Sequence, residues 1–234
     1  MFPFKRKHRR KLIVKNGLVL YLDGKDFSNS PPASSWTDKS GNNNATPSNF
    51  AYTPSSGSDN NGGVVLDGVD DKATISNSSI LKLGVSDFTL GFTFKTNSQT
   101  NYQQLLSRRN SASSNIEYYF AYNGAANSID FKYSTDGVTP LLCSFPFTPI
   151  TGQIYDLSLK RSGNNLYLYI NSIQHTTVNT INGSLYLSNA DLIIGALNSN
   201  GVYGSFLGGT IKRILQYNRA LSNTEILRNY STIK

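Results

Sequence analysis

Hydrophobic and polar residues alternate with period two along several stretches of the chain. The clearest runs span 88–95, 116–122, 129–133, 155–160 and 166–171. Alternation of this kind turns one set of side chains toward a core and the other toward the opposite face, as in antiparallel sheets. The chain is therefore predicted to contain many strands that pair with their sequence neighbours.

Turn and cap signals complete the predicted fold. The Ser-Gly-Asn-Asn sequence at 162–165 separates two alternating runs and predicts a hairpin. Segment 27–63 is rich in Ser, Asn, Gly and Pro, so we expect long loops there with at most one short strand. Ser222 precedes Glu225 by three residues, the spacing of a capping box, and predicts a helix over 222–229. The predicted fold is all-β, a two-sheet antiparallel sandwich with one short C-terminal helix.

Charge divides the chain into two unequal parts. The 234 residues carry 22 basic and 14 acidic side chains, and seven of the basic ones fall within residues 1–15 with no acidic residue. The rest of the chain is close to neutral. A block of like charge is usually a solvated tail or a docking segment for an anionic nucleic acid, membrane or protein surface. We expect it to be a partner-docking arm with these contact residues: Phe2, Phe4, Lys5, Arg6, Lys7, Arg9, Arg10 and Lys11.

Export and membrane signals are not found in the sequence. The apolar run 12–14 is too short for the core of a signal peptide, and no run approaches the length of a membrane span. The single Cys143 excludes an internal disulfide and lies in a strand-like stretch, where a buried, unreactive thiol is expected. These features predict synthesis in a reducing cytoplasm and no membrane partner.

Four motifs in order carry a family resemblance. They occupy 17–23 (Gly-Leu-Val-Leu-Tyr-Leu-Asp), 36–45 (beginning Trp-Thr-Asp-Lys-Ser-Gly), 65–71 and 208–222. Together they resemble the concanavalin A-like, laminin-G-type jelly rolls, of the kind found in bacteriophage virion proteins. The resemblance covers about residues 16–232 and implies one jelly-roll domain, which we assign to 16–234. The charge distribution places a basic arm before it at 1–15.

The same fold is used by glucanases, so catalysis has to be considered. Retaining glycosidases need two carboxyl groups about 5 Å apart, and the related glucanases carry them as Glu-x-Asp-x-x-Glu. This chain has only Glu117 and Glu225, in unrelated positions. Gly-x-Ser-x-Gly elbows and phosphate-binding loops are also missing from the sequence. We therefore expect no enzyme activity and no cofactor.

Metal binding receives a similar prediction. The resemblance implies a structural Ca²⁺ site with an Asp in a C-terminal Ile-Asp-Glu-Val strand, but here Lys212 stands at the Asp position. Calcium requires oxygen ligands, so loss of the site is expected. Asp67, Asp70 and Asp71 could bind a cation from a loop, or they could simply cap a turn. We favour the turn and expect no metal.

Binding is the remaining class of function. The side chains of Tyr119, Tyr167, Tyr169 and Tyr186 are predicted to lie opposite the aliphatic core positions, as an aromatic patch on one sheet. Such a patch could contact a glycan or a protein, or merely cover the sheet.

These features together predict a non-enzymatic virion structural protein, either a capsid decoration or auxiliary protein or a fibre module. Its expected partners are other virion proteins, capsid shell or fibre subunits, and its expected location is the virion, after synthesis in the host cytoplasm. The alternative is a carbohydrate-binding module that attaches to a host-surface glycan. Nucleic acid is the least favoured partner because the body lacks a continuous basic stripe.

Overall fold

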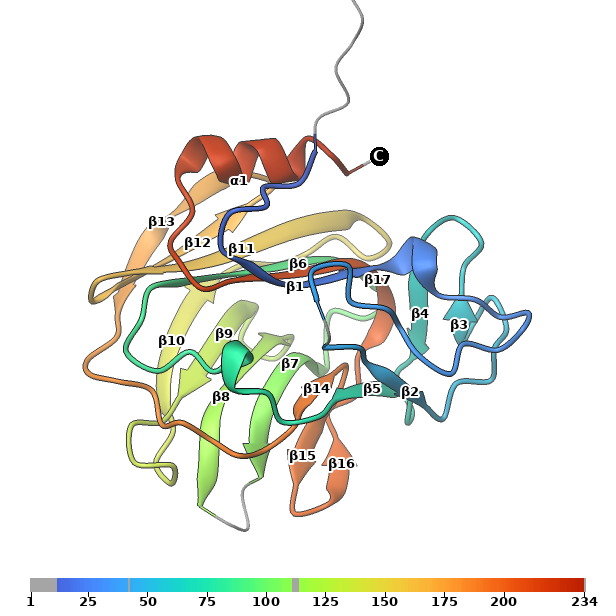
Figure 1. Ribbon diagram of the computed structural model, residues 1–234, viewed down its shortest axis with the longest axis horizontal. Coiled ribbons are helices and arrows are strands. Elements are labelled where there is room, and N and C mark those ends of the chain that lie inside the picture. The colour runs from blue at the N-terminus through green and yellow to red at the C-terminus, as the bar shows by residue number, and fades with distance from the viewer. Residues whose placement is uncertain (1–11, 42, 111–113, 234) are drawn as a thin grey trace, which may run out of the picture.

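The computed structural model describes residues 12–41, 43–110 and 114–233 and shows two antiparallel sheets packed face to face (Figure 1). The predicted sandwich is therefore confirmed. The predicted contact residues of the basic arm, within 2–11, lie outside the described residues. In the part of the chain that is described, no helix is long and apolar enough to cross a membrane.

The larger sheet has eight strands in the order β13-β12-β11-β6-β17-β4-β3, and β1 also pairs with β17. Its strands pair in antiparallel fashion throughout the described chain. The bounds are β1 Leu18–Asp23, β3 Gly57–Ser58, β4 Val64–Asp67, β6 Phe88–Thr96, β11 Ile154–Ser162, β12 Asn165–Ile170, β13 Ile173–Thr180 and β17 Gly208–Tyr217.

The smaller sheet has seven strands in the order β10-β9-β8-β7-β14-β5-β2. Its bounds are β2 Thr46–Ser48, β5 Lys72–Ile75, β7 Tyr102–Asn110, β8 Asn115–Asn123, β9 Ser128–Tyr133, β10 Leu141–Pro146 and β14 Leu192–Ile194. A separate hairpin and two short 3₁₀ turns complete the connections: β15 Leu197–Ser199, β16 Val202–Gly204, η1 Gly24–Asp26 and η2 Ser79–Leu81. Segment 27–63 thus holds two short strands, β2 and β3, in place of the single one expected.

The core lies between the two sheets and follows the alternation in the sequence. Phe88 of β6 meets Phe131 of β9 across the sandwich, with ring centroids 6.0 Å apart. Each side chain of this size stabilises the fold by about 1.5–3 kcal/mol when it is fully buried. Cys143 is buried in the same core, and burial raises the pKa of its thiol to about 11, so the thiol stays protonated and unreactive.

Helix α1, Asn223–Tyr230, covers part of the outer face of the eight-stranded sheet (Figure 1). Its capping box forms as predicted: the Ser222 hydroxyl accepts from the Glu225 backbone N–H, and the Glu225 carboxylate accepts from the Ser222 backbone N–H. The helix buries Ile226 in a second apolar cluster outside the main core, which contains Ile13, Val14, Tyr169, Leu215, Tyr217, Leu221 and Ile226.

The segment before β1 belongs to this second cluster. Ile13 and Val14 are buried in it, although the sequence analysis places the boundary between arm and domain after residue 15. That boundary therefore cuts through packed chain. The physical reason is that the short apolar run 12–14, too short for a signal peptide, completes the contact beneath α1.

Candidate functional site

The four predicted contact tyrosines do not lie on one sheet. Tyr119 is on β8 of the seven-stranded sheet, Tyr167 and Tyr169 are on β12 of the eight-stranded sheet, and Tyr186 is in the connection between β13 and β14. The prediction of a single aromatic patch is wrong on this point. Alternation assigns a side chain to the inner or outer face of its own strand, but it does not say which sheet the strand joins.

Tyr169 is a structural residue of the eight-stranded sheet. Its side chain is 1% exposed and belongs to the cluster under α1. Its hydroxyl donates to Asn223 Oδ1 at the first residue of the helix (2.7 Å) and accepts from Lys160 Nζ (2.8 Å). The Lys160 ammonium also lies over the rings of Tyr167 and Tyr169, 5.0 and 4.9 Å from their centroids. Tyr169 therefore holds the helix in place and is not accessible to a partner.

Tyr119, which is 7% exposed, lies in a different setting, on the outer face of the seven-stranded sheet. Strand register places it directly beside Lys132 of β9 and Ser107 of β7. The Arg109 guanidinium is 5.0 Å and the Lys132 ammonium 5.5 Å from the centre of the Tyr119 ring. The same ammonium is 5.5 Å from the ring of Tyr102. We call Tyr102, Arg109, Tyr119 and Lys132 the tyrosine–cation row.

Polar groups of the tyrosine–cation row are only partly satisfied within the described chain. The Tyr102 hydroxyl and Arg109 Nε are buried and have no hydrogen-bond partner there. Burial raises the pKa of Tyr102 and of Tyr119, with a smaller contribution from the negative charge of Asp130. Both hydroxyls therefore remain protonated at neutral pH and can donate a hydrogen bond.

Asp130 is the carboxylate whose charge acts on Tyr102 and Tyr119. Both of its oxygens accept hydrogen bonds from other side chains. Oδ1 accepts from the hydroxyls of Ser128 (2.8 Å) and Ser144 (2.7 Å), and Oδ2 accepts from Asn123 Nδ2 (3.1 Å). Neither Arg109 nor Lys132 is among the ion pairs of the described residues. The row thus presents two positive charges without a carboxylate counterion.

Tyr102, Arg109 and Lys132 were not identified from the sequence. A usable signal existed, because Lys132 alternates with the core residue Phe131 just as Tyr119 alternates with Phe120. Pairing the two runs through the Asn-Gly turn at 123–124 would have placed Lys132 beside Tyr119. Tyr102 and Arg109 carry no comparable signal, since bulges interrupt the register of β7 on β8.

The two glutamates are engaged in ion pairs. Glu117 and its partner Arg108 are fully buried, with Nε 3.1 Å from Oε2, and Glu117 Oε1 also accepts from the Leu83 backbone N–H (2.6 Å). Burial raises the Glu117 pKa to about 7, against the opposing effects of Leu83 and Arg108. Glu225 pairs with Arg219 at 2.6 Å beside its capping box. Each of the two glutamates therefore has an arginine as its charged partner.

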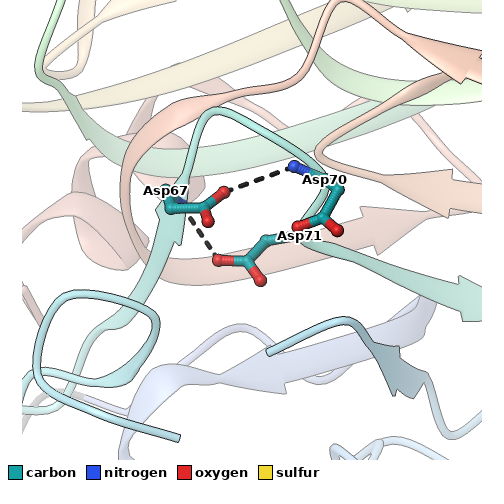
Figure 2. A group of neighbouring side chains, drawn as sticks. All are labelled: Asp67, Asp70 and Asp71. Carbon is teal, nitrogen blue, oxygen red and sulfur yellow. Dashed lines mark hydrogen bonds between the residues drawn. The ribbon is translucent and has the colours of Figure 1, made fainter. Parts of the chain in front are cut away.

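Asp67, Asp70 and Asp71 gather at the turn between β4 and β5, with carboxylate oxygens within 4.8 Å of one another (Figure 2). The group forms an internally bonded turn: Asp71 accepts from the Asp67 backbone N–H (2.9 Å) and the Ser56 hydroxyl (3.0 Å), and Asp67 accepts from the Val69 N–H (2.8 Å). Burial, and then repulsion from Asp67 and Asp70, raises the Asp71 pKa to about 6. The contacts are those of the capped turn expected from the sequence.

Lys212 is also committed to internal contacts. Its ammonium lies 2.8 Å from Asp59 Oδ2 and 3.1 Å from the Asn61 carbonyl oxygen. This ion pair lowers the pKa of Asp59, against the opposing effect of burial. The resemblance implies a calcium ligand at position 212. The Lys212 ammonium instead contacts the oxygen atoms there as a positive charge.

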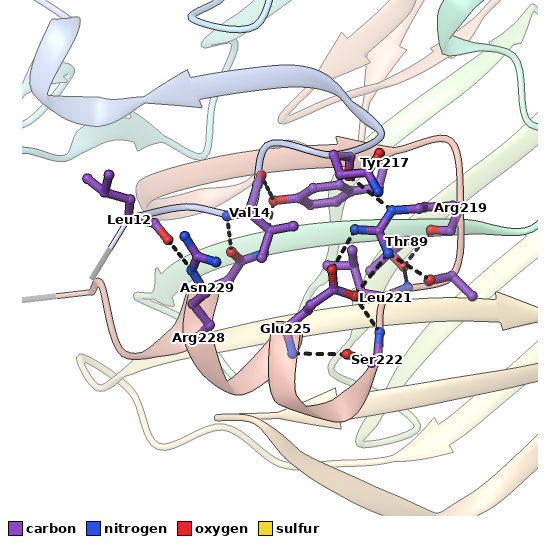
Figure 3. A network of polar contacts seen from close by, with 12 residues as sticks. Leu12, Val14, Thr89, Tyr217, Arg219, Leu221, Ser222, Glu225, Arg228 and Asn229 are labelled. Carbon is purple, nitrogen blue, oxygen red and sulfur yellow. Dashed lines mark hydrogen bonds and ion pairs between the residues drawn. The ribbon is translucent and has the colours of Figure 1, made fainter. Parts of the chain in front are cut away.

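Hydrogen bonds hold the N-terminal segment against both α1 and β17 (Figure 3). Asn229 Oδ1 accepts from the Val14 backbone N–H (2.9 Å), the Val14 carbonyl accepts from the Tyr217 hydroxyl (3.0 Å), and Asn229 Nδ2 donates to that same hydroxyl (2.9 Å). Arg228 Nε adds a bond to the Leu12 carbonyl at 2.7 Å. The chain that follows the basic block is thus held firmly against the eight-stranded sheet.

Comparison with protein families gives one match over most of the chain. The family described as the concanavalin A-like lectin/glucanases superfamily matches residues 66–227. A search of the curated proteins finds no match.

Solved structures share the fold at low sequence identity. The botulinum neurotoxin serotype G binding domain is 16% identical with a TM-score of 0.66, and the match covers 92% of this chain and 50% of that one. The serotype D binding domain is 14% identical with a TM-score of 0.67, covering 93% and 51%. A Trypanosoma rangeli sialidase in complex with sialic acid is 18% identical with a TM-score of 0.64, covering 92% and 32%. The chain therefore spans about half or a third of these proteins, and the likeness concerns the fold alone.

Proposed function

Because the chain belongs to the concanavalin A-like lectin/glucanases superfamily, we propose that it is a non-catalytic recognition module that binds saccharides on the outer face of its seven-stranded sheet. The observation that carries the proposal is the tyrosine–cation row, where aromatic rings lie beside hydrogen-bond donors that have no partner in the described chain, on a face that none of its helices covers. Aromatic rings stack on sugar C–H faces, and polar side chains set orientation and specificity.

The absence of catalysis is part of the same proposal. It is supported by the ion pairs of Glu117 with Arg108 and of Glu225 with Arg219, because a glycosidase needs two carboxyl groups that are available to the substrate. The neighbouring sialidase is catalytic by name, but at 18% identity it supports only the fold.

Binding of the purified chain to a glycan array, followed by isothermal titration calorimetry of each hit, tests the proposal. We expect saturable binding of at least one saccharide and no release of new reducing ends from it. Failure of every saccharide to bind would contradict recognition, and release of reducing ends would contradict the non-catalytic assignment.

The virion role predicted from the sequence is retained as a second proposal, with the basic segment as the docking element. The observation in its favour is that residues 12–14 are anchored to α1 directly after the block Lys5–Lys11. A charged segment that is joined to a fixed attachment point starts from a defined place on the body, and this lowers the entropy lost when it docks.

A truncation of residues 2–11 tests this second proposal better than one that also removes 12–15, because Ile13 and Val14 are buried in the domain. We expect the truncated chain to keep its thermal unfolding midpoint and to fail to join assembling virus particles. Replacing the basic residues of the block with Gln is the matched control for length. Incorporation of the truncated chain at the normal level would contradict the docking role.

A further inference from the structure

The tyrosine–cation row holds two cations around a single ring. Arg109 and Lys132 lie 5.0 and 5.5 Å from the centre of Tyr119, and neither forms an ion pair within the described chain. The ring attracts each cation, but the two positive charges repel each other and have no carboxylate counterion in the described chain. A ligand anion that contacts both cations would offset this repulsion.

The hydrogen-bond donors of the tyrosine–cation row favour one chemical class of bound anion, a carboxylate. A guanidinium offers parallel N–H groups that match the two oxygens of a carboxylate, and an ammonium adds a point charge with rotatable donors. The buried Tyr102 hydroxyl, which has no partner in the described chain, supplies a further donor beside Lys132. The one acidic side chain of the neighbourhood, Asp130, is turned to Asn123, Ser128 and Ser144.

We infer that the tyrosine–cation row binds the carboxylate of an acidic sugar, with Arg109 and Lys132 as the charged contacts and the hydroxyls of Tyr102 and Tyr119 as additional donors. This inference rests on the proposed saccharide binding and specifies its ligand class. It assigns charge selectivity to the seven-stranded face, which the fold by itself does not provide.

Lys160 provides an internal control of the same local chemistry. It too lies over two tyrosine rings, Tyr167 and Tyr169, on the other sheet. Its ammonium, however, already donates to the Tyr169 hydroxyl at 2.8 Å and to Asn223 Oδ1 at 3.4 Å. Lys160 is therefore satisfied within the chain, whereas the contacts of Lys132 among the described residues are with the two rings.

The test uses the full chain and pairs of saccharides that differ only in charge. Calorimetry compares sialylated and uronic-acid oligosaccharides with their methyl esters, which keep the sugar and remove the negative charge. We expect binding of the acids and a loss of about tenfold or more on methylation, since charge-assisted hydrogen bonds are the strong ones. R109Q and K132Q are expected to weaken binding about tenfold or more each, and K160Q to leave it unchanged.

Several results would overturn the inference while leaving saccharide recognition intact. These are equal binding of acid and methyl ester, tighter binding of a sulfated counterpart, or equal losses from K132Q and K160Q. Binding of an acidic peptide or of single-stranded DNA with no acidic sugar bound would also overturn it. If no saccharide binds at all, the proposed function fails together with the inference. Circular dichroism and the thermal midpoint of each variant establish that the losses do not come from unfolding.

Discussion

The two outer faces of the sandwich carry similar residues in different surroundings. On the eight-stranded sheet, Lys160 and Tyr169 bond to Asn223 of α1 and lie at the edge of an apolar cluster. On the seven-stranded sheet, Lys132 and Tyr119 have no covering helix, and the neighbouring Arg109 adds a second unpaired charge. A lysine over tyrosine rings is thus a structural contact where another element satisfies it and a candidate binding group where none does.

The largest effect that the comparison predicts is a loss of stability when the packing of α1 on the eight-stranded sheet is weakened. Ile226→Ala removes a fully buried side chain from the cluster under α1. We expect the free energy of unfolding to fall by about 2–5 kcal/mol because a cavity replaces packed atoms. Urea denaturation measures it. Leu227→Ala on the same helix, at a side chain 51% exposed, is the control, with an expected change within about 0.5 kcal/mol. Equal losses from both variants would show that α1 does not pack as described.

A second variant separates the anchored segment from the helix. Asn229→Ala leaves the Val14 N–H and the Tyr217 hydroxyl without their buried partner. We expect a loss of about 1–3 kcal/mol, the desolvation cost of unpaired groups. Faster tryptic cleavage after Lys15 should accompany it, because the segment detaches. The exposed Asn165→Ala is the control, and unchanged proteolysis of the Asn229 variant would refute the anchoring role.

The acidic turn between the two faces predicts a pH dependence. Asp71 sits between β4 of one sheet and β5 of the other, and its pKa is raised from 3.8 to about 6. Between these values the folded chain keeps a proton that the unfolded chain has released, so stability falls as pH rises through this window. Asp71→Asn should flatten this slope in urea midpoints measured between pH 4 and about 6.

A smaller slope should remain in the Asp71→Asn variant. The Glu117 pKa is raised from 4.5 to about 7, so its contribution has the same sign and extends closer to neutrality. An unaltered slope in the variant would mean that Asp71 is not the group that titrates.

The smallest expected effect compares the two lysines directly. Lys160→Gln removes an ammonium with two hydrogen bonds and two ring contacts, and we expect a loss of about 0.5–1 kcal/mol. Lys132→Gln removes ring contacts but also relieves repulsion from Arg109, so the change in unfolding free energy should be close to zero. A larger loss from Lys132→Gln would show that Lys132 serves stability and not binding.

Much of the fold could be predicted because its determinants are local. The period-two runs mark β6, β8, β9, β11 and β12, and the Ser222–Glu225 spacing marks the start of α1. The family resemblance was also confirmed, by a match over residues 66–227. Several strands are also buried on the face that points away from the main core, and this could not be predicted. Alternation does not reveal whether a helix, a loop or solvent covers that outer face.

The candidate site was harder to predict for the same reason. Tyr119 and Tyr169 both point to the outer face of their strands. Tyr169 packs beneath α1, whereas Tyr119 lies beside Arg109 and Lys132. Strand order and the bulges in β7 decide which side chains meet, and both depend on contacts between distant parts of the chain. The ion pair of Arg108 with Glu117 was missed because neither residue signals a buried partner in sequence.

The bonds that hold Leu12 and Val14 to α1 bring the first and last described segments of the chain together on one side of the sandwich. The described backbone from Leu12 to the end of α1 therefore forms an almost closed ring. A peptide linker of a few residues could join the two segments, and the backbone could then be opened elsewhere, for example at the exposed Asn200–Gly201 tip of the β15–β16 hairpin, to give a circular permutant with the same strand pairings.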